Sequence, residues 1–351
     1  MAWMLYGANG YTGEMIAREA VSRGMHPVLA GRSRHKIAPL AEELGLETRV
    51  FTLDETTSAA AHLENIELVL LTAGPFSKTS AQMVQACIAA GAHYLDITGE
   101  IDIFEQVAAS DRAAREAGVV LCPGVGFDVV PTDCVAAALK EALPDATELD
   151  LGFDTDMKMS PGTLKTTIEG AAVGGRIRRD GVIRTVGHGY ATRRIDYGRG
   201  EKLAASFPWG DVATAYHSTG IGDITVYVPT SRAELIGMRI INPLRPILRQ
   251  RWLQSLLGRA ISRFVKGPDE LARSKTPVYI WGEARNPSGE RRVARVKTTN
   301  SYSLTIPAAL AVTRFLLDNS PAPGFTTPSR LMGHDLIARV EGGGTIEMSG
   351  S

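Results

Sequence analysis

A glycine-rich turn near the start of the chain constrains its fold more than any other feature. The turn, Gly7-Ala8-Asn9-Gly10-Tyr11-Thr12-Gly13, follows a short apolar run and precedes a helical pattern over 14–23. This order brings bare backbone and the free N–H groups of a helix start to one place, which is the arrangement that binds a pyrophosphate. We therefore predict a dinucleotide site whose first contacts come from the seven residues of the turn.

Short apolar runs alternate with helical patterns as far as Pro131. The expected strands are 3–6, 27–30, 48–51, 68–72, 93–97 and 119–122, and the expected helices are 14–23, 37–44, 81–90 and 104–116. Strands that are apolar throughout, with helices between them, indicate a parallel sheet covered on both faces. The pattern predicts an α/β fold with a doubly wound parallel sheet.

The pattern changes after Pro131. A helix is expected over 132–143, and the stretches 148–156, 223–228, 278–284 and 292–298 then alternate apolar and polar residues. A period of two indicates half-exposed strands of a mixed or antiparallel sheet. We therefore expect a dinucleotide-binding domain over 1–131 and an α+β domain for substrate binding or dimerisation over 132–305. Two more helices are expected within 306–341, and the tail 342–351 is expected to be flexible.

Composition and charge argue against several classes of protein. The chain has 351 residues, of which 44% are hydrophobic and 22% charged, as in ordinary globular proteins. Its formal net charge of zero argues against a nucleic-acid partner. Residues 1–150 carry 10 Lys and Arg against 21 Asp and Glu, whereas residues 151–351 carry 28 against 17, which supports a division into two domains.

Sequence signals of secretion, metal binding and hydrolysis are absent. The cysteines Cys87, Cys122 and Cys134 are too few for a disulfide scaffold and suit a reducing compartment. We see no secretory signal and no apolar run long enough to span a bilayer, so we expect a cytoplasmic protein. No H-E-x-x-H motif, C-x-x-C pair or Asp-rich loop predicts a metal site, and no G-x-S-x-G elbow predicts a hydrolase.

The end of the second strand indicates which nucleotide is bound. NAD-dependent enzymes usually place an Asp or Glu about 20 residues after the glycine motif, where it holds the ribose 2′-hydroxyl. Here Arg32, Ser33 and Arg34 occupy that place, and no acidic residue accompanies them. Arginine and serine suit a dianionic 2′-phosphate, which favours NADP(H) as the cofactor.

The fourth strand ends in small residues, Thr72-Ala73-Gly74-Pro75-Phe76. Small side chains at the carboxyl end of a strand let the second ribose and the nicotinamide lie close to the backbone. We count these five residues among the expected cofactor contacts, although a plain strand-to-helix turn would look the same.

Several segments resemble the saccharopine dehydrogenase NADP-binding superfamily. They include the glycine turn, 72–76, 90–96 and a longer motif, Cys122-Pro123-Gly124-Val125-Gly126-Phe127-Asp128-Val129-Val130-Pro131-Thr132-Asp133. This motif is similar to G-F-D-x-x-P-S-D, the signature of a branch that holds saccharopine dehydrogenase-like oxidoreductases and trans-acting enoyl reductases, with threonine here in place of serine. Ser160-Pro161-Gly162-Thr163 resembles the G-G-T turn of that branch, and 322–333 resembles its C-terminal T-P-x-x-x-x-G turn.

The resemblance implies a Rossmann-like cofactor domain, an inserted α+β domain on a mixed sheet, and C-terminal helices that return to the first domain. It also implies NADP-linked reduction, but it does not fix the substrate. The branch includes amino-acid imine reductases, enoyl reductases that act on acyl chains, and members with no assigned reaction. A homodimer is expected only by analogy with the fold class.

Asp128 and Lys165 are the candidate catalytic residues. Asp128 follows the sixth strand and Phe127, whose ring could pack on the nicotinamide, and Gly99 and Gly124 complete the expected cofactor contacts. Lys165 could neutralise a carboxylate or phosphate of the substrate, or it could simply be an exposed lysine. Asp133 could act in the same region or cap the helix that starts near it.

A basic, apolar stretch covers 235–268. It contains no Asp or Glu and seven basic residues, and its aliphatic residues recur mostly at steps of three and four. This is the pattern of an amphipathic helix at a membrane surface. It would also suit an anionic acyl carrier, or a helix packed on the protein's own core, and the sequence leaves the three open.

Three hypotheses for function follow. The first is an NADPH-dependent reductase of a C=C or C=N bond in a small or acyl-linked apolar substrate. The second is an amino-acid imine reductase of the saccharopine type, which predicts a pocket of arginines drawn from Arg176, Arg178, Arg179, Arg193 and Arg194. The third is a non-catalytic NADP-binding module on a membrane or partner enzyme.

Overall fold

The computed structural model describes residues 2–155, 173–248, 250 and 276–350. The chain forms two compact units. The first unit comprises Met1–Val130 and Ser301–Glu341, and the second comprises Pro131–Asn300 and Gly342–Ser351.

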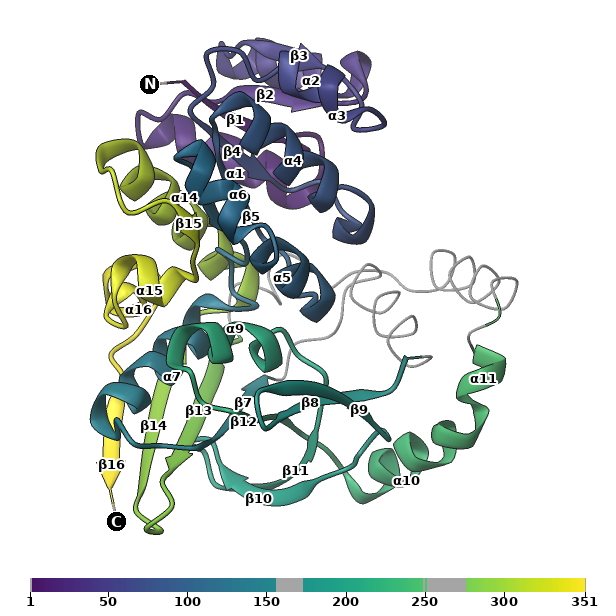
Figure 1. Cartoon of the computed structure of the whole chain (residues 1–351), viewed down its shortest axis with the longest axis vertical. Helices are drawn as coiled ribbons and strands as arrows, with labels where there is room; N and C mark the ends of the chain where they lie inside the picture. Colours follow the sequence, from purple (N-terminus) through teal and green to yellow (C-terminus); the bar gives the residue numbers. More distant parts are fainter. Residues whose placement is uncertain (1, 156–172, 249, 251–275, 351) are drawn as a thin grey trace. The chain divides into compact units, whose positions relative to one another are not determined.

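The first unit is built on a seven-stranded parallel sheet with the order β15-β6-β5-β4-β1-β2-β3 (Figure 1). Six of its strands follow the order 3-2-1-4-5-6 reversed, which is the doubly wound order of dinucleotide-binding folds. Its strands are β1 Trp3–Tyr6, β2 Val28–Gly31, β3 Thr48–Val50, β4 Leu68–Leu71, β5 His93–Asp96, β6 Val120–Cys122 and β15 Gly324–Phe325. The prediction of a parallel doubly wound sheet is confirmed.

Helices connect the strands of this sheet along the chain, and two more follow its last strand. They are α1 Tyr11–Ser22, α2 Arg34–Leu44, α3 Thr56–Ala61, η1 Phe76–Lys78, α4 Ser80–Ala90, α5 Ile101–Ala108, α6 Asp111–Ala117, α14 Ser301–Asp318, α15 Pro328–Met332 and α16 Leu336–Arg339. The single helix predicted over 104–116 is two helices, α5 and α6. The helix expected at the C-terminal end is also divided, because Gly333 adopts a φ of +85° between α15 and α16.

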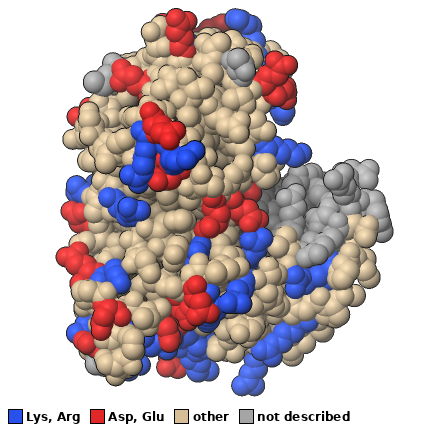
Figure 2. Space-filling model, viewed as in Figure 1, with Lys and Arg blue, Asp and Glu red and all other residues tan. Residues whose placement is uncertain are grey.

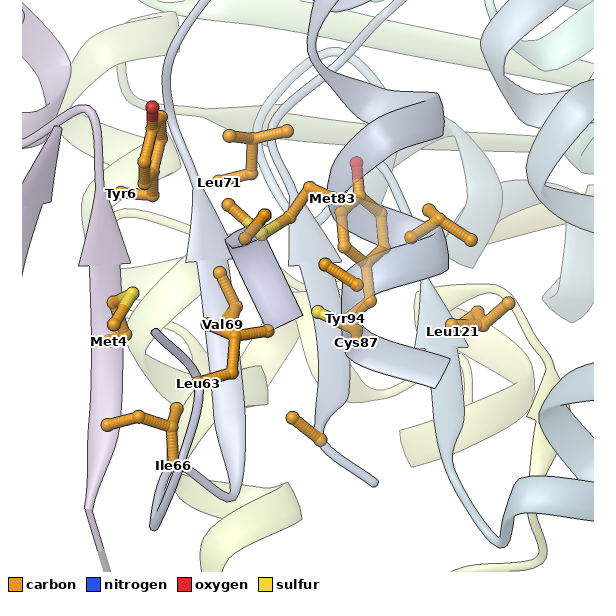
Figure 3. Packing of buried hydrophobic residues seen from close by; sticks show 14 of the residues in the cluster. Met4, Tyr6, Leu63, Ile66, Val69, Leu71, Met83, Cys87, Tyr94 and Leu121 are labelled. Carbon is orange, nitrogen blue, oxygen red and sulfur yellow. The ribbon is translucent and has the colours of Figure 1, made fainter. Parts of the chain in front are cut away.

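The core on one face of the sheet explains why these strands are apolar throughout. Met4 of β1, Val69 of β4 and Leu121 of β6 lie in one buried cluster with Met83 and Cys87 of α4 (Figure 3). Because successive strand residues point to opposite faces, Leu5, Leu29 and Leu70, which have no exposed surface, fill the other face. α14 packs there against α1 and β4. All three cysteines are buried, and none of them forms a disulfide.

The second unit is a mixed nine-stranded sheet with helices. Its main path is β10-β11-β12-β7-β13-β14-β16, and β8 pairs with β12 and β9 off that path. Among the described strands of this unit, β12 and β7 pair in parallel, and the other pairs are antiparallel. The strands are β7 Glu148–Thr155, β8 Gly175–Arg179, β9 Val182–Val186, β10 Thr192–Asp196, β11 Glu201–Ser206, β12 Asp223–Pro229, β13 Val278–Arg285, β14 Arg291–Thr298 and β16 Glu347–Gly350. The predicted α+β unit on a mixed sheet is confirmed.

The described helices of this unit are α7 Val130–Ala142, α9 Asp211–Thr219, α10 Arg232–Ile241, η2 Asn242–Leu244 and α11 Arg245–Leu248. α7 packs closely on the sheet, because a Cβ at Gly282 of β13 would lie 2.6 Å from Val135 of α7. The neighbouring residue Trp281 points to the opposite face, where it packs with Tyr197 and Tyr227.

Two sequence predictions differ from the structure at the ends of this unit. The tail expected to be flexible instead adds a strand, β16, to the edge of the sheet beside β14, which supplies backbone hydrogen-bond partners. Residues 301–305, placed in the α+β domain, begin α14 and belong to the first unit. Among the described residues, no helix is both long and apolar enough to cross a membrane.

Candidate cofactor and active site

The glycine turn joins β1 to α1 at the carboxyl end of the parallel sheet. Gly7 has a φ of +96°, a conformation that residues with a side chain rarely adopt. The Gly7 N–H donates to Ala30 O of β2 at 2.8 Å, and the Gly10 N–H donates to Gly7 O at 2.9 Å, so the turn is tightly folded. Gly10 precedes α1 and has no side chain to cap the first N–H groups of the helix. Those N–H groups face the position of a pyrophosphate in this arrangement.

The turn leaves no room for a side chain at Gly7 or Gly13. A Cβ at Gly13 would lie 2.4 Å from Gly7 O and 2.9 Å from Thr72 Oγ1, and a Cβ at Gly7 would lie 2.6 Å from Ala73 N. The glycine turn therefore contacts the loop that follows β4. These contacts explain why both positions are glycine, and they bring together two segments that the sequence predicted separately.

The loop after β4 is fastened by its threonines. Thr72 Oγ1 donates to Tyr6 O at 3.1 Å, and Thr79 Oγ1 donates to Ala73 O at 2.7 Å. Between them, Ala73 and Phe76 are half-buried, whereas Gly74 and Pro75 are exposed. The loop is thus held in place while its middle residues remain open to solvent.

Arg32 and Ser33 follow β2 on the same side of the sheet as the glycine turn. Arg32 and Arg34 are exposed, and Ser33 directly precedes the first residue of α2, with its Oγ 3.0 Å from His35 Nδ1. Burial raises the pKa of Tyr6 at the end of β1 to about 12, and the nearby charge of Arg32 opposes that rise. A guanidinium exposed at this edge of the sheet can donate two hydrogen bonds to one phosphate.

The strands β5 and β6 end at a buried polar network. The carboxylate of Asp96 is fully buried and accepts hydrogen bonds from Tyr94 Oη, Thr98 N and Gly124 N at 2.6, 2.9 and 2.8 Å. The Tyr94 hydroxyl lies 2.9 Å from Ser80 Oγ of α4. Burial raises the pKa of Asp96 to about 6, because its effect outweighs that of the hydrogen bonds, which lower the pKa. Asp96 therefore holds the loops after β5 and β6 together.

Asp128 lies where these two loops meet. A Cβ at Gly99 would lie 2.9 Å from Asp128 Oδ2, so the absence of a side chain at Gly99 makes room for this carboxyl. The Asp128 residue keeps part of its surface exposed, and burial of the carboxyl raises its pKa to about 6. Phe127 is buried beside it, and its N–H donates to Thr305 Oγ1 of α14 at 3.1 Å.

Two further candidates from the sequence remain, one of which the structure describes. Lys165 and the turn 160–163 lie outside the described residues. Asp133 lies in the first turn of α7, because that helix starts at Val130, and it accepts a hydrogen bond from Ser218 of α9. Its carboxylate thus joins two helices of the second unit.

The sequence did not identify the supporting residues Ser80 and Thr305. Both are ordinary hydroxyl residues within helical patterns, and their roles depend on strands and loops far away in the sequence. Asp96 lies in a strand predicted over 93–97, and the sequence around it gives no sign that its carboxylate is buried.

The arginines considered for a carboxylate pocket contact other groups of the second unit, as Arg178, Arg179, Arg193 and Arg194 show. Arg178 donates to Val212 O and Gly181 O, and Arg179 lies 3.3 Å from Thr225 Oγ1. Arg193 pairs with Asp150 at 2.5 Å and Glu283 at 3.0 Å, beside a surface hollow of about 280 Å³. Arg194 pairs with the exposed Glu201 at 3.0 Å. The charges of Arg193 and Arg194 are thus balanced by carboxylates of the protein itself, and the Arg178 guanidinium is held by backbone carbonyls.

The first unit thus has the strand order, the glycine turn and the helix start of a dinucleotide-binding domain. Residues 3–122 match the family model described as "Saccharopine dehydrogenase NADP binding domain". The first unit thus carries a domain similar to the NADP-binding domain of saccharopine dehydrogenase, over about a third of the chain.

The chain is also similar to curated relatives over part of their length, and to a solved structure in its fold. The chain is 31% identical over 170 residues to a protein of Mycobacterium tuberculosis named "Trans-acting enoyl reductase", covering 44% of this chain and 38% of that protein. It is 28% identical over 194 residues to an Arabidopsis thaliana protein named "Probable mitochondrial saccharopine dehydrogenase-like oxidoreductase", covering 48% and 42%. Saccharopine dehydrogenase from Saccharomyces cerevisiae has the same fold, with a TM-score of 0.67, 10% identity and 99% of both chains covered. The matches thus span about two fifths of the curated relatives' length.

Proposed function

We propose that the chain is an NADPH-dependent reductase of a C=C bond in an acyl-linked, apolar substrate. The observation that carries the proposal is the junction of Gly7, Gly13 and Ala73, which fits a dinucleotide at the carboxyl end of the sheet. The names of the mycobacterial relatives, which describe enoyl reductases, favour C=C over C=N as the bond reduced.

Different residues of the first unit bind different parts of NADPH. The N–H groups at the start of α1 bind the pyrophosphate, and Arg32, Ser33 and Arg34 bind the 2′-phosphate. The loop 72–76, together with Gly99, Gly124 and Phe127, borders the nicotinamide half. Bound NADPH would supply a hydride to one carbon of the double bond, and a proton to the other carbon completes the saturated product and leaves NADP⁺.

Asp128 is the proposed source of that proton. It lies on the loop after β6, at the same edge of the sheet as the glycine turn, and part of its surface is open. With its pKa raised to about 6, the carboxyl holds a proton in a useful fraction of molecules near neutral pH. Lys165 remains a second proposal, as a residue that neutralises an anionic part of the substrate.

The test is NADPH oxidation by the full chain with two substrate classes in parallel. One class is a medium-chain enoyl thioester, and the other is a 2-oxo acid offered together with an amino acid. Turnover of the thioester alone supports the proposal. Turnover of the second mixture alone would establish the saccharopine-type alternative, although the existing partners of Arg178, Arg193 and Arg194 weigh against it.

A non-catalytic NADP-binding module is the remaining alternative. It predicts tight NADPH binding by calorimetry without turnover of any substrate in the panel. We also propose a cytoplasmic homodimer, on the analogy of the fold class alone, and light scattering on the purified chain measures the oligomeric state. Contact between 235–268 and a membrane or an acyl carrier is a separate proposal.

A further inference from the structure

Four large aliphatic side chains are exposed in a row on α10, η2 and α11. They are Ile236, Ile240, Leu244 and Ile247, with 58, 60, 46 and 55% of their surfaces exposed, and we call them the aliphatic stripe. Their spacing of four, four and three residues places them on one side of a helix. We infer that this stripe docks the protein onto a bilayer surface that carries anionic lipid headgroups. The inference does not depend on the reaction that the protein catalyses.

The opposite side of the same segment is fastened to the second unit. Leu235 lies close to Gly189, since a Cβ at Gly189 would be 2.8 Å from Leu235 Cδ1. Asn242 accepts from His188 N at 2.7 Å and donates to His188 O at 3.2 Å. Arg245 donates to Val173 O. Because these contacts fix the rotation of the helix, the stripe faces away from the loop 187–189.

The charges beside the stripe are positive. Arg232 and Arg239 of α10 are exposed, and the contact of Arg239 with Gly189 O is to a backbone carbonyl, so it does not neutralise the guanidinium charge. The acidic Glu234 is engaged at the start of α10, where it accepts from Ser231 N at 2.7 Å in a capping box. No Asp or Glu occurs over 235–268. On the face shown in Figure 2, the surface over α10 is formed by tan and blue atoms.

A lipid surface fits this combination better than a second copy of the chain. In a symmetric dimer the stripe would face its own copy, and the arginines would then repel one another. At a bilayer, aliphatic side chains enter the acyl boundary while guanidinium groups meet lipid phosphates. An acidic acyl carrier could meet the same charges, so the experiment must separate it from lipid.

The experiment is co-sedimentation of the full chain with vesicles of phosphatidylcholine, with and without phosphatidylglycerol. We expect binding to the anionic vesicles that weakens as salt is added. The substitutions Ile236→Ser, Ile240→Ser, Leu244→Ser and Ile247→Ser, combined in one variant, should lower the partition coefficient by at least about tenfold. The matched control is Val182→Ser in β9, whose side chain is 57% exposed outside the stripe.

The far-UV circular dichroism spectrum and the thermal melting curve show whether the stripe variant is folded. A folded stripe variant that has lost vesicle binding, with a control that has kept it, supports the inference. Three results would overturn it: no binding of the wild-type chain to anionic vesicles, equal binding by the stripe variant, or an equal loss in Val182→Ser. Binding of an acidic acyl carrier through the stripe, without vesicle binding, would replace lipid by that protein partner.

Discussion

The hydroxyl of Tyr94 donates a 2.6 Å hydrogen bond to the buried carboxylate of Asp96, two residues further along the same strand end. The other oxygen of that carboxylate accepts from Thr98 N and Gly124 N. One side chain therefore holds the loop that contains Gly99 and the loop that contains Asp128. We regard Asp96 as a positioning residue that acts through these loops.

Replacing Asp96 should destabilise the first unit. Asp96→Ala leaves three buried donors without an acceptor, and each unsatisfied buried group costs about 1–3 kcal/mol. We expect the free energy of unfolding to fall by about 3 kcal/mol or more in urea denaturation. Asp96→Asn, which keeps one acceptor oxygen, should cost less, so equal stabilities of Asp96→Ala and the wild type would contradict the assigned role.

The same carboxyl should make stability depend on pH. Because burial raises the Asp96 pKa from 3.8 to about 6, the folded state holds this proton more tightly than the unfolded chain. The stabilisation from that proton is fully present below about pH 4 and is lost as pH rises through 6. We expect the wild type to lose about 2–3 kcal/mol relative to Asp96→Asn between pH 4 and 7. Parallel curves for the two proteins would show that Asp96 does not titrate in this range.

The sequence was informative where local chemistry decides the structure. The turn 7–13 and the small residues 72–76 could be assigned because glycine and short side chains have few other reasons to follow a buried strand. The contact between Gly13 and Thr72, by contrast, joins residues that are 59 positions apart, and only the order of β1 and β4 in the sheet brings them together.

Other features depend on pairing that a sequence pattern does not contain. β16 was expected to be a flexible tail because 342–351 is rich in glycine and serine, but the free edge of β14 supplies its hydrogen bonds. Ser80 and Thr305 support the site from helices whose own pattern gives no reason to single out a hydroxyl. The aliphatic stripe is the opposite case. The sequence shows the helical spacing of its residues, but it does not show whether they face solvent or the rest of the protein.

Gly13 should not tolerate even one additional carbon. In Gly13→Ala the new Cβ would lie 2.4 Å from Gly7 O, so the turn must open and displace the start of α1. We expect NADPH affinity to fall by at least about tenfold and the melting temperature to drop by several degrees. The control is Gly237→Ala in α10, where nothing lies within 4 Å of the new carbon. Unchanged NADPH binding in Gly13→Ala would mean that the turn is not the pyrophosphate site.

Arg32 should determine the preference between NADPH and NADH. Hydrogen bonds to charged groups contribute about 1.5–3 kcal/mol, so Arg32→Ala should raise the Kd for NADPH roughly 10- to 100-fold. The Kd for NADH should change little, because that nucleotide has no 2′-phosphate. Calorimetry with both nucleotides measures the two effects, and Lys36→Ala, another exposed basic residue nearby, is the control. Equal losses for both nucleotides would place Arg32 away from the 2′-phosphate.

Asp128 should affect turnover without affecting cofactor binding. Loss of a positioned acid typically costs about 10²-fold or more, so Asp128→Asn should lower kcat by that order and leave the Kd for NADPH unchanged. Because the pKa of Asp128 is raised to about 6, the wild-type rate should decline as pH rises above 6, and the decline should vanish in Asp128→Asn. Asp102→Asn, at an exposed aspartate of α5, controls for the loss of a negative charge. If Asp128→Asn keeps both the full rate and the pH dependence, the proton comes from another group, and the loop after β6 only borders the cofactor.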